Sequence, residues 1–254
     1  MRNAWWNEVH GPMKARVGSD LLACRRRAGA VFTVAMLAAL LCACRQEPEH
    51  ANSAPPKDAA ATATAAPSAD NRPVIVCFGD SLTAGFGVDP GKSYPDLLQA
   101  LLDRGGYRYR VVNLGVSGDT TQDGLDRLPL VLAEMPRDVV LEFGANDGLR
   151  GQPVANAEAN LAQMIEALKK QGITAVLAGI TLPPNYGPDY ITKFNTMYSD
   201  LAKKYKLALI PFLLQGAAGH DDLMQRDGLH PNTEGTRLVA DNVARVLEPL
   251  LEKK

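Results

Sequence analysis

VIVCFGDSLTAG, residues 74–85, is the stretch that decides the fold of this chain. Five apolar residues rich in valine and isoleucine end at a Gly-Asp-Ser turn, which is typical of a fully buried parallel strand. Catalytic groups of open α/β sheets collect at the carboxyl ends of such strands, and Ser81 lies at this end. We expect Gly79 to let the chain turn sharply and Asp80 to stabilise the turn. The alternative is an ordinary strand-to-helix turn with a serine N-cap.

The chain around and after this stretch alternates short apolar runs with longer amphipathic segments. The predicted strands are Val74–Phe78, Tyr109–Leu114, Val139–Phe143, Ala175–Ile180 and Ala208–Pro211. The predicted helices are Tyr94–Leu102, Thr120–Glu134, Val154–Gln171, Asp189–Tyr205 and Thr233–Leu251. Such alternation implies right-handed crossovers, and therefore an α/β domain whose parallel sheet is covered by helices on both faces.

The segment before this domain resembles the signal sequence of a bacterial lipoprotein. Arg25-Arg26-Arg27 precede a short apolar run that ends at Leu41-Cys42-Ala43-Cys44. A basic flank, a short apolar core and small residues at its end are typical of a secretory signal, and the run is short for a membrane span. We expect residues 1–44 to be this signal, with Cys44 as the lipidated first residue of the mature chain. An uncleaved anchor, ordinary signal cleavage and translation from Met13 are the alternatives.

Residues 45–72 are rich in alanine and proline and have no apolar face, so we expect them to form a disordered tether. Residues 73–254 are numerous enough for one well-buried domain. The expected location is the cell envelope, with this domain lipid-anchored on the periplasmic side of a bacterial membrane.

Charge and cysteine content argue against several classes of protein. The chain has 27 basic and 28 acidic residues; loss of residues 1–44 removes six basic and two acidic ones and leaves a formal charge of −5. An acidic chain without basic clusters does not favour nucleic acid as a partner. Once Cys44 carries lipid, Cys77 has no partner for an intrachain disulfide. No Cys/His spacing suggests zinc, so we expect no metal.

Four polar loops contain the candidate catalytic residues. They are Gly79–Leu82, Asn113–Thr120, Phe143–Gly148 and Asp227–Asn232. A serine hydrolase needs a nucleophile, a base, a group that orients the base, and oxyanion donors, and these loops offer each of them.

Ser81, Gly118, Asn146 and His230 match, in the same order, the four sequence blocks of the GDSL, or SGNH, hydrolase family. Residues 73–254 therefore resemble this family. The blocks are most similar to the arylesterase and thioesterase I/lysophospholipase branch, apart from Ala145, where that branch usually has glycine.

The resemblance implies a flavodoxin-like, three-layer α/β/α fold with a five-stranded parallel sheet in the order 2-1-3-4-5. Strands one and three then lie side by side where the winding direction reverses, and Ser81 and Asn146 both border the crevice that opens there. Asp227 and His230 have to reach this crevice from the loop before the last helix.

His230 is the candidate base that removes the proton of Ser81, because imidazole titrates near neutrality. Asp227 lies three residues earlier, close enough in a turn to accept from Nδ1 and set the tautomer. Asp80 and Asp147 are the rivals for this role. We prefer Asp227, because the other two adjoin the nucleophile and the oxyanion donor and are better suited to stabilising those turns.

The candidate oxyanion donors are the backbone N–H groups of Ser81 and Gly118 and the side-chain amide of Asn146. Gly118 would let the backbone approach the substrate closely, where a side chain would block it. A simple turn glycine and a turn asparagine are the alternatives. The resemblance also implies that the loop containing Leu182 and Pro183 walls the acyl pocket.

These residues predict a serine esterase that acts on acyl esters, thioesters or lysophospholipids and needs no cofactor. We expect it to be a monomer. A carbohydrate deacetylase is the alternative within the same class. A non-catalytic, flavodoxin-like lipoprotein that binds a small molecule or a partner is the alternative from another class.

Overall fold

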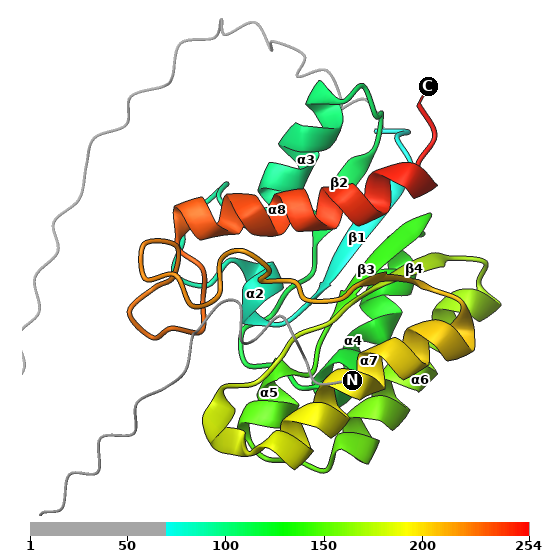
Figure 1. Cartoon of the computed structure of the whole chain (residues 1–254). Coiled ribbons are helices and arrows are strands. Elements are labelled where there is room, and N and C mark those ends of the chain that lie inside the picture. Colours follow the sequence, from blue (N-terminus) through cyan, green and yellow to red (C-terminus); the bar gives the residue numbers. More distant parts are fainter. Residues whose placement is uncertain (1–69, 254) are drawn as a thin grey trace, which may run out of the picture. The chain divides into compact units, whose positions relative to one another are not determined.

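A five-stranded parallel sheet forms the centre of residues 70–253, the part of the chain that this computed structural model describes (Figure 1). The strands are β1 (Val74–Gly79), β2 (Arg110–Asn113), β3 (Asp138–Glu142), β4 (Thr174–Ala178) and β5 (Ala208–Ile210). Their order across the sheet is β2-β1-β3-β4-β5, and every neighbouring pair is parallel. The predicted fold class and sheet order are confirmed.

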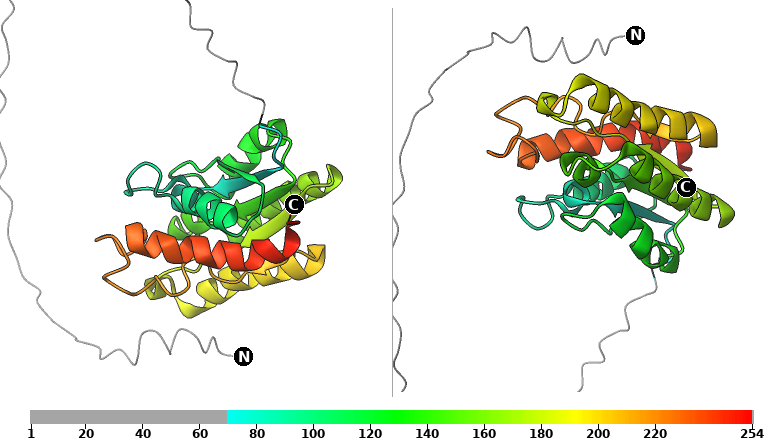
Figure 2. Two further views of the ribbon diagram at one scale, coloured as in Figure 1. Left: turned by 90° about the horizontal axis from the view of Figure 1, so that it is seen from above. Right: turned by 90° about the horizontal axis from the view of Figure 1, so that it is seen from below.

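Helices cover both faces of this sheet. They are α2 (Ser81–Ala84), α3 (Tyr94–Arg104), α4 (Thr121–Ala133), α5 (Ala145–Leu149), α6 (Val154–Lys170), α7 (Pro188–Tyr205) and α8 (Thr233–Leu247), with 3-10 turns at Pro184–Tyr186 and Glu248–Leu250. Helices α3 and α8 pack together on one face, whereas α4, α6 and α7 form the layer on the other (Figures 1 and 2).

The two central strands, β1 and β3, consist entirely of buried residues. Their apolar side chains enter the core because both faces of a parallel sheet are covered by helices. The strands run in register from Ile75 opposite Asp138 to Gly79 opposite Glu142. Their carboxyl ends therefore meet at one edge of the sheet, which places the turn after β1 beside the turn after β3.

Three local features differ from the sequence-based expectation. The short helices α2 and α5 follow β1 and β3 directly, and four or five residues are too few to show a helical period. The last helix ends at Leu247 instead of Leu251, because Pro249 lacks the N–H group that would continue the α-helical hydrogen bonds.

Gly79 also has a different role from the one expected. It is the last residue of β1, and its φ angle is not in the left-handed region. A Cβ atom at this position would overlap the Thr83 hydroxyl and the Glu142 carboxyl. Glycine is therefore needed here for space and not for a sharp turn.

The expected signal segment, Cys44 and the tether as far as residue 69 lie outside the described residues, so they stay predictions. No helix within residues 70–253 has both the length and the apolar character needed to cross a membrane.

Candidate active site

Ser81 is the first residue of α2, immediately after the carboxyl end of β1. The N-cap of this short helix is Asp80, whose carboxylate accepts a hydrogen bond from the Leu82 N–H at 3.0 Å. The alternative that Ser81 itself is the N-cap is therefore wrong. Because Asp80 caps the helix, the Ser81 hydroxyl is left for another partner.

That partner is His230, whose Nε2 lies 2.9 Å from Ser81 Oγ. On the other side of the ring, Nδ1 lies 2.7 Å from Asp227 Oδ2. With the proton on Nδ1, His230 donates to Asp227 and turns the lone pair of Nε2 toward the Ser81 hydroxyl. The structure thus brings together the three residues that the sequence selected as nucleophile, base and orienting acid.

The turn around Asp227 keeps this carboxylate in place. Its Oδ1 accepts hydrogen bonds from the Leu229 N–H at 2.9 Å and the His230 N–H at 3.1 Å, while Oδ2 faces the ring. Partial burial opposes the charged form, but the hydrogen bonds from His230 and Leu229 outweigh it, so the pKa of Asp227 lies below its ordinary value. The group beside the ring is therefore an anion at neutral pH.

The loop that carries His230 is held against the turn after α2 by a residue that the sequence did not single out. Gln225 donates from Nε2 to the backbone oxygen of Phe86 at 2.7 Å and of Pro231 at 3.0 Å, and its own N–H donates to the His230 oxygen at 2.8 Å. The exposed ring of Phe86 contacts the His230 ring, with 4.7 Å between their centroids.

The rival carboxylates lie elsewhere. Asp80 caps α2, as described above. Asp147 is buried and accepts from the N–H of Thr121 at 2.8 Å and from its hydroxyl at 2.6 Å, so it holds the start of α4. Both aspartates thus stabilise turns next to the site, and neither is a hydrogen-bond partner of the His230 ring.

The backbone N–H groups of Ser81 and Gly118 donate to no other group among the described residues. Gly118 has a φ angle of +91°, a conformation that residues with a side chain rarely adopt. Its carbonyl accepts from Arg150 Nη2 at 2.9 Å, which holds the peptide in this orientation. Two unused N–H donors close to a nucleophile can stabilise an oxyanion.

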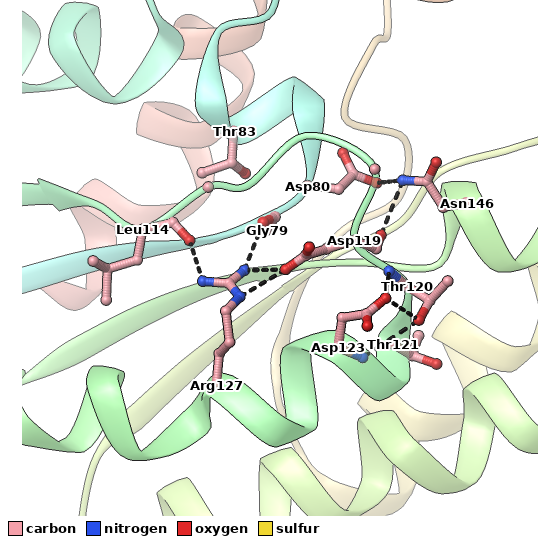
Figure 3. Close-up of polar contacts among 12 residues, drawn as sticks. Gly79, Asp80, Thr83, Leu114, Asp119, Thr120, Thr121, Asp123, Arg127 and Asn146 are labelled. Carbon is pink, nitrogen blue, oxygen red and sulfur yellow. Dashed lines mark hydrogen bonds and ion pairs between the residues drawn. The ribbon is translucent and has the colours of Figure 1, made fainter. Parts of the chain in front are cut away.

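Asn146, the second residue of α5, reaches across to both neighbouring loops (Figure 3). Its Nδ2 donates to the Asp119 carbonyl at 2.9 Å and to Asp80 Oδ2 at 3.2 Å. Both amide hydrogens therefore have acceptors in the free protein. Asn146 thus contacts the turn of Ser81 and the loop of Gly118, and it could serve an oxyanion only by sharing or exchanging one of these bonds.

An arginine of α4 ties the loops after β1 and β2 together (Figure 3). Arg127 pairs with Asp119 at 2.5 Å and donates to the backbone oxygens of Leu114 at 3.1 Å and Gly79 at 3.4 Å. The sequence showed it only as one polar residue of an amphipathic helix, so its role could not be seen there. It stabilises the backbone from which the predicted oxyanion donors project.

The predicted acyl-pocket residues differ in their exposure. Leu182 is only 2% exposed and packs against Gly148 of α5, where a Cβ atom would meet its methyl groups. Pro183 is half-buried. Of the two, only Pro183 presents appreciable surface, and Leu182 supports the helix that carries Asn146. No three His, Cys, Asp or Glu side chains within residues 70–253 are grouped so as to hold a metal ion.

Comparison with known proteins identifies the family to which the chain belongs. Residues 77–238 match the model of the GDSL-like Lipase/Acylhydrolase family. The chain is 46% identical over 178 residues to Esterase TesA of Pseudomonas aeruginosa, covering 70% of this chain and 89% of that protein. It is 38% identical over 178 residues to Thioesterase 1/protease 1/lysophospholipase L1 of Escherichia coli, covering 70% of this chain and 84% of that protein.

Among solved structures, the psychrotrophic esterase EstA from Pseudoalteromonas sp. superimposes with a TM-score of 0.67 at 32% sequence identity. The match covers 70% of this chain and 97% of that one. The non-catalytic alternative is therefore set aside: this chain is an enzyme of the GDSL, or SGNH, esterase family.

Proposed function

We propose that the chain hydrolyses acyl esters through an acyl-Ser81 intermediate. The observation that carries this proposal is the continuous hydrogen-bonded series from Ser81 Oγ to His230 Nε2 and from His230 Nδ1 to Asp227 Oδ2. A serine hydroxyl is a weak nucleophile until a base removes its proton, and this series supplies the base and the group that orients it.

In the first half of the reaction, Ser81 Oγ attacks the ester carbonyl carbon while His230 Nε2 takes the hydroxyl proton. The carbonyl oxygen becomes an oxyanion, which accepts from the Ser81 and Gly118 N–H groups, with Asn146 Nδ2 as a third donor. As the tetrahedral intermediate collapses, the bond to the alcohol breaks and His230 passes its proton to the leaving oxygen. Asp227 stabilises the imidazolium that exists between these two proton transfers.

In the second half, water attacks the acyl-Ser81 carbonyl, and His230 takes a proton from that water. Collapse of the second intermediate returns the proton to Ser81 Oγ and releases the carboxylic acid. The reaction consumes one ester and one water and yields one acid and one alcohol, so no cofactor enters the balance.

The proposed substrates are aryl esters, acyl thioesters and lysophospholipids. The Escherichia coli relative is named as a thioesterase and a lysophospholipase, and the Pseudomonas aeruginosa relative as an esterase. A chain-length series of p-nitrophenyl esters and acyl-CoA thioesters, compared at equal enzyme concentration, would rank these classes.

The mechanism is tested by mixing the protein with p-nitrophenyl butyrate before and after treatment with a serine-reactive phosphonate. We expect the phosphonate to abolish hydrolysis and to add its mass to the peptide that contains Ser81. The solved EstA structure is described as inhibited by monoethylphosphonate, which makes this reagent class a suitable probe. A Ser81→Ala variant that still hydrolyses the ester at the wild-type rate would exclude the proposed nucleophile.

The lipid anchor at Cys44 and the periplasmic location belong to the same proposal. The Arg25–Arg27 flank, the apolar run and the Leu41–Cys44 box support them. The tether would then let the domain act on substrates near the membrane while remaining in water.

A further inference from the structure

Glu142 is a fully buried carboxyl group directly behind the turn that carries Ser81. It is the last residue of β3, opposite Gly79 in β1. Its Oε2 accepts a hydrogen bond from the Asp80 N–H at 3.2 Å and from the Thr83 hydroxyl at 2.9 Å. The carboxyl group therefore binds the residues on both sides of Ser81 in the sequence.

The surrounding residues form a niche that fits this side chain. Gly79 leaves the space that a Cβ atom would otherwise take from the Glu142 carboxyl. The Thr83 hydroxyl lies 3.1 Å from the hydroxyl of Tyr94, a residue of α3 that is itself fully buried. Tyr198 of α7, also buried, donates to the carbonyl of Phe143, the residue after Glu142.

Glu142 has no cation to balance a negative charge. Among the described residues, no lysine, arginine or histidine lies within ion-pair distance of Glu142 or of Asp80. Moreover, Glu142 Oε1 is buried without a hydrogen-bond partner. A buried carboxylate with one oxygen unsatisfied and no counter-ion is strongly disfavoured, so the neutral acid is the favoured form.

The neighbouring Asp80 carboxylate also favours the neutral form of Glu142. Burial and the charge of Asp80 hold the pKa of Glu142 well above its ordinary value. Burial raises the pKa of Asp80 to about 6, and the hydrogen bond from the Leu82 N–H and the charge of His230 limit that rise. Burial beside a second carboxyl group therefore favours the neutral form of Glu142.

Asp80 links Glu142, to which its N–H group donates, to the proposed oxyanion site. Its Oδ1 accepts from the Leu82 N–H and its Oδ2 from Asn146 Nδ2 at 3.2 Å. The position of the Ser81 backbone and that of the Asn146 amide thus depend on one buried acid pair. A second full negative charge here would also oppose the charge that develops on the substrate oxygen, which a neutral acid does not.

We propose that Glu142 is a positioning residue that works in its protonated form. With Asp80, it holds the Ser81 turn and the Asn146 amide in the geometry that the reaction needs. The effect on catalysis rests on the proposed function, in which Ser81 is the nucleophile.

The kinetic test compares Glu142→Gln with Glu142→Ala in the full chain, using p-nitrophenyl butyrate. Glutamine is uncharged and can accept from the same two donors through its amide oxygen, so it should keep kcat within about threefold of the wild type. Alanine removes these bonds, and a displacement of about 1 Å at the nucleophile can cost about 10²-fold. We therefore expect Glu142→Ala to lower kcat by about 10- to 100-fold with little change in KM.

Asp138→Ala is the matched control. Asp138 lies at the other end of β3, is also buried, and its Oδ2 has no hydrogen-bond partner, although Arg137 Nε lies 3.9 Å away. Its replacement should change the melting temperature but leave kcat unchanged at a temperature where the protein is folded. If Glu142→Ala keeps the wild-type kcat, Glu142 does not position the site. If Glu142→Gln is as slow as Glu142→Ala, the protonated form is not what the site requires.

The protonation state is tested without turnover by infrared difference spectroscopy between Ser81→Ala and Ser81→Ala/Glu142→Gln at pH 7. A protonated carboxyl has a C=O stretch at higher frequency than carboxylate and amide groups. We expect that band in Ser81→Ala and its loss in the double variant; a spectrum without it overturns the proposal. Phosphonate labelling of wild-type Ser81 separately tests the proposed function. A failure of the proposed function can therefore be distinguished from a failure of the proposal on Glu142.

Discussion

Gly79 and Glu142 face each other across β1 and β3, and the glycine has no Cβ atom where the glutamate carboxyl lies. The Gly-Asp-Ser turn therefore requires glycine because a residue more than 60 positions later in the chain fills the space that a side chain would need. An extra methyl group would also lie 2.5 Å from the Glu142 carbonyl oxygen, a backbone atom that cannot move independently of the sheet.

Gly79→Ala should consequently disturb stability and activity together. Overpacking of a buried site costs about 1–3 kcal/mol, so the melting temperature should fall by several degrees. Displacement of the Ser81 turn should lower kcat in the same variant. Thermal unfolding and ester hydrolysis on one preparation check both effects, and a variant with wild-type values of both would contradict the packing argument.

Asp227→Asn should leave the fold intact and reduce kcat by about 10⁴-fold, as expected when a carboxylate sets the tautomer of the base. The substituted amide can still accept the Leu229 and His230 N–H bonds through its oxygen, so the turn should persist. Steady-state kinetics with a circular-dichroism melt as the folding control tests this. A rate near that of the wild type would assign the orienting role to another residue.

Asn146→Ala should lower kcat by about 10²–10³-fold with little change in KM, because an oxyanion donor acts mainly on the transition state. The same substitution removes the bonds to Asp80 and to the Asp119 carbonyl, so some loss of melting temperature is also expected. Measuring kcat well below the melting temperature separates the two effects. If kcat then stays within a few-fold of the wild type, Asn146 only stabilises the loops.

Asp138→Asn should stabilise the protein at pH 7 but not at pH 4. Burial raises the pKa of Asp138 from 3.8 to about 6. Between these pH values the folded state keeps a proton that the unfolded chain has released, so stability falls as the pH rises through this window. The neutral asparagine avoids a loss on the order of 2–3 kcal/mol. Unfolding midpoints across this pH range test the prediction, which fails if the variant is no more stable than the wild type at pH 7.

Processing of the N-terminal segment can be followed by fluorescence. Trp5 and Trp6 are the two tryptophans of the chain, and both lie in the segment that we expect to be removed. Protein purified from membranes should show tyrosine emission only, and Cys44→Ser should block maturation or release the protein from the membrane. Tryptophan emission from the membrane-bound protein would exclude cleavage.

The strands and helices were predictable because their determinants are local in the sequence, whereas the order of the strands in the sheet was implied by the family resemblance. The apolar run of β1 ends at a breaker, and the amphipathic segments between the strands are long enough to show a helical period. The polar loops contained the candidate catalytic residues, and the family resemblance singled out Ser81, Gly118, Asn146 and His230 within them.

What could not be predicted depends on contacts between distant segments. Arg127 and Gln225 act through backbone carbonyls of other loops, and no sequence pattern reports such partners. Glu142 did leave a signal, since it is a lone acid near the end of an apolar strand. The role of this acid becomes apparent only in the structure, where Gly79 and Asp80 lie beside it.

The separation of 149 positions between Ser81 and His230 has a consequence for the nascent chain. Translation adds about 5–20 residues per second, so about 7–30 s pass between synthesis of the serine and synthesis of its base. During that time the chain has no partner for the Ser81 hydroxyl and is inert toward esters in the compartment where it is made. Ribosome-bound chains that end before Asp227 should accordingly resist phosphonate labelling, whereas released full-length chains should react.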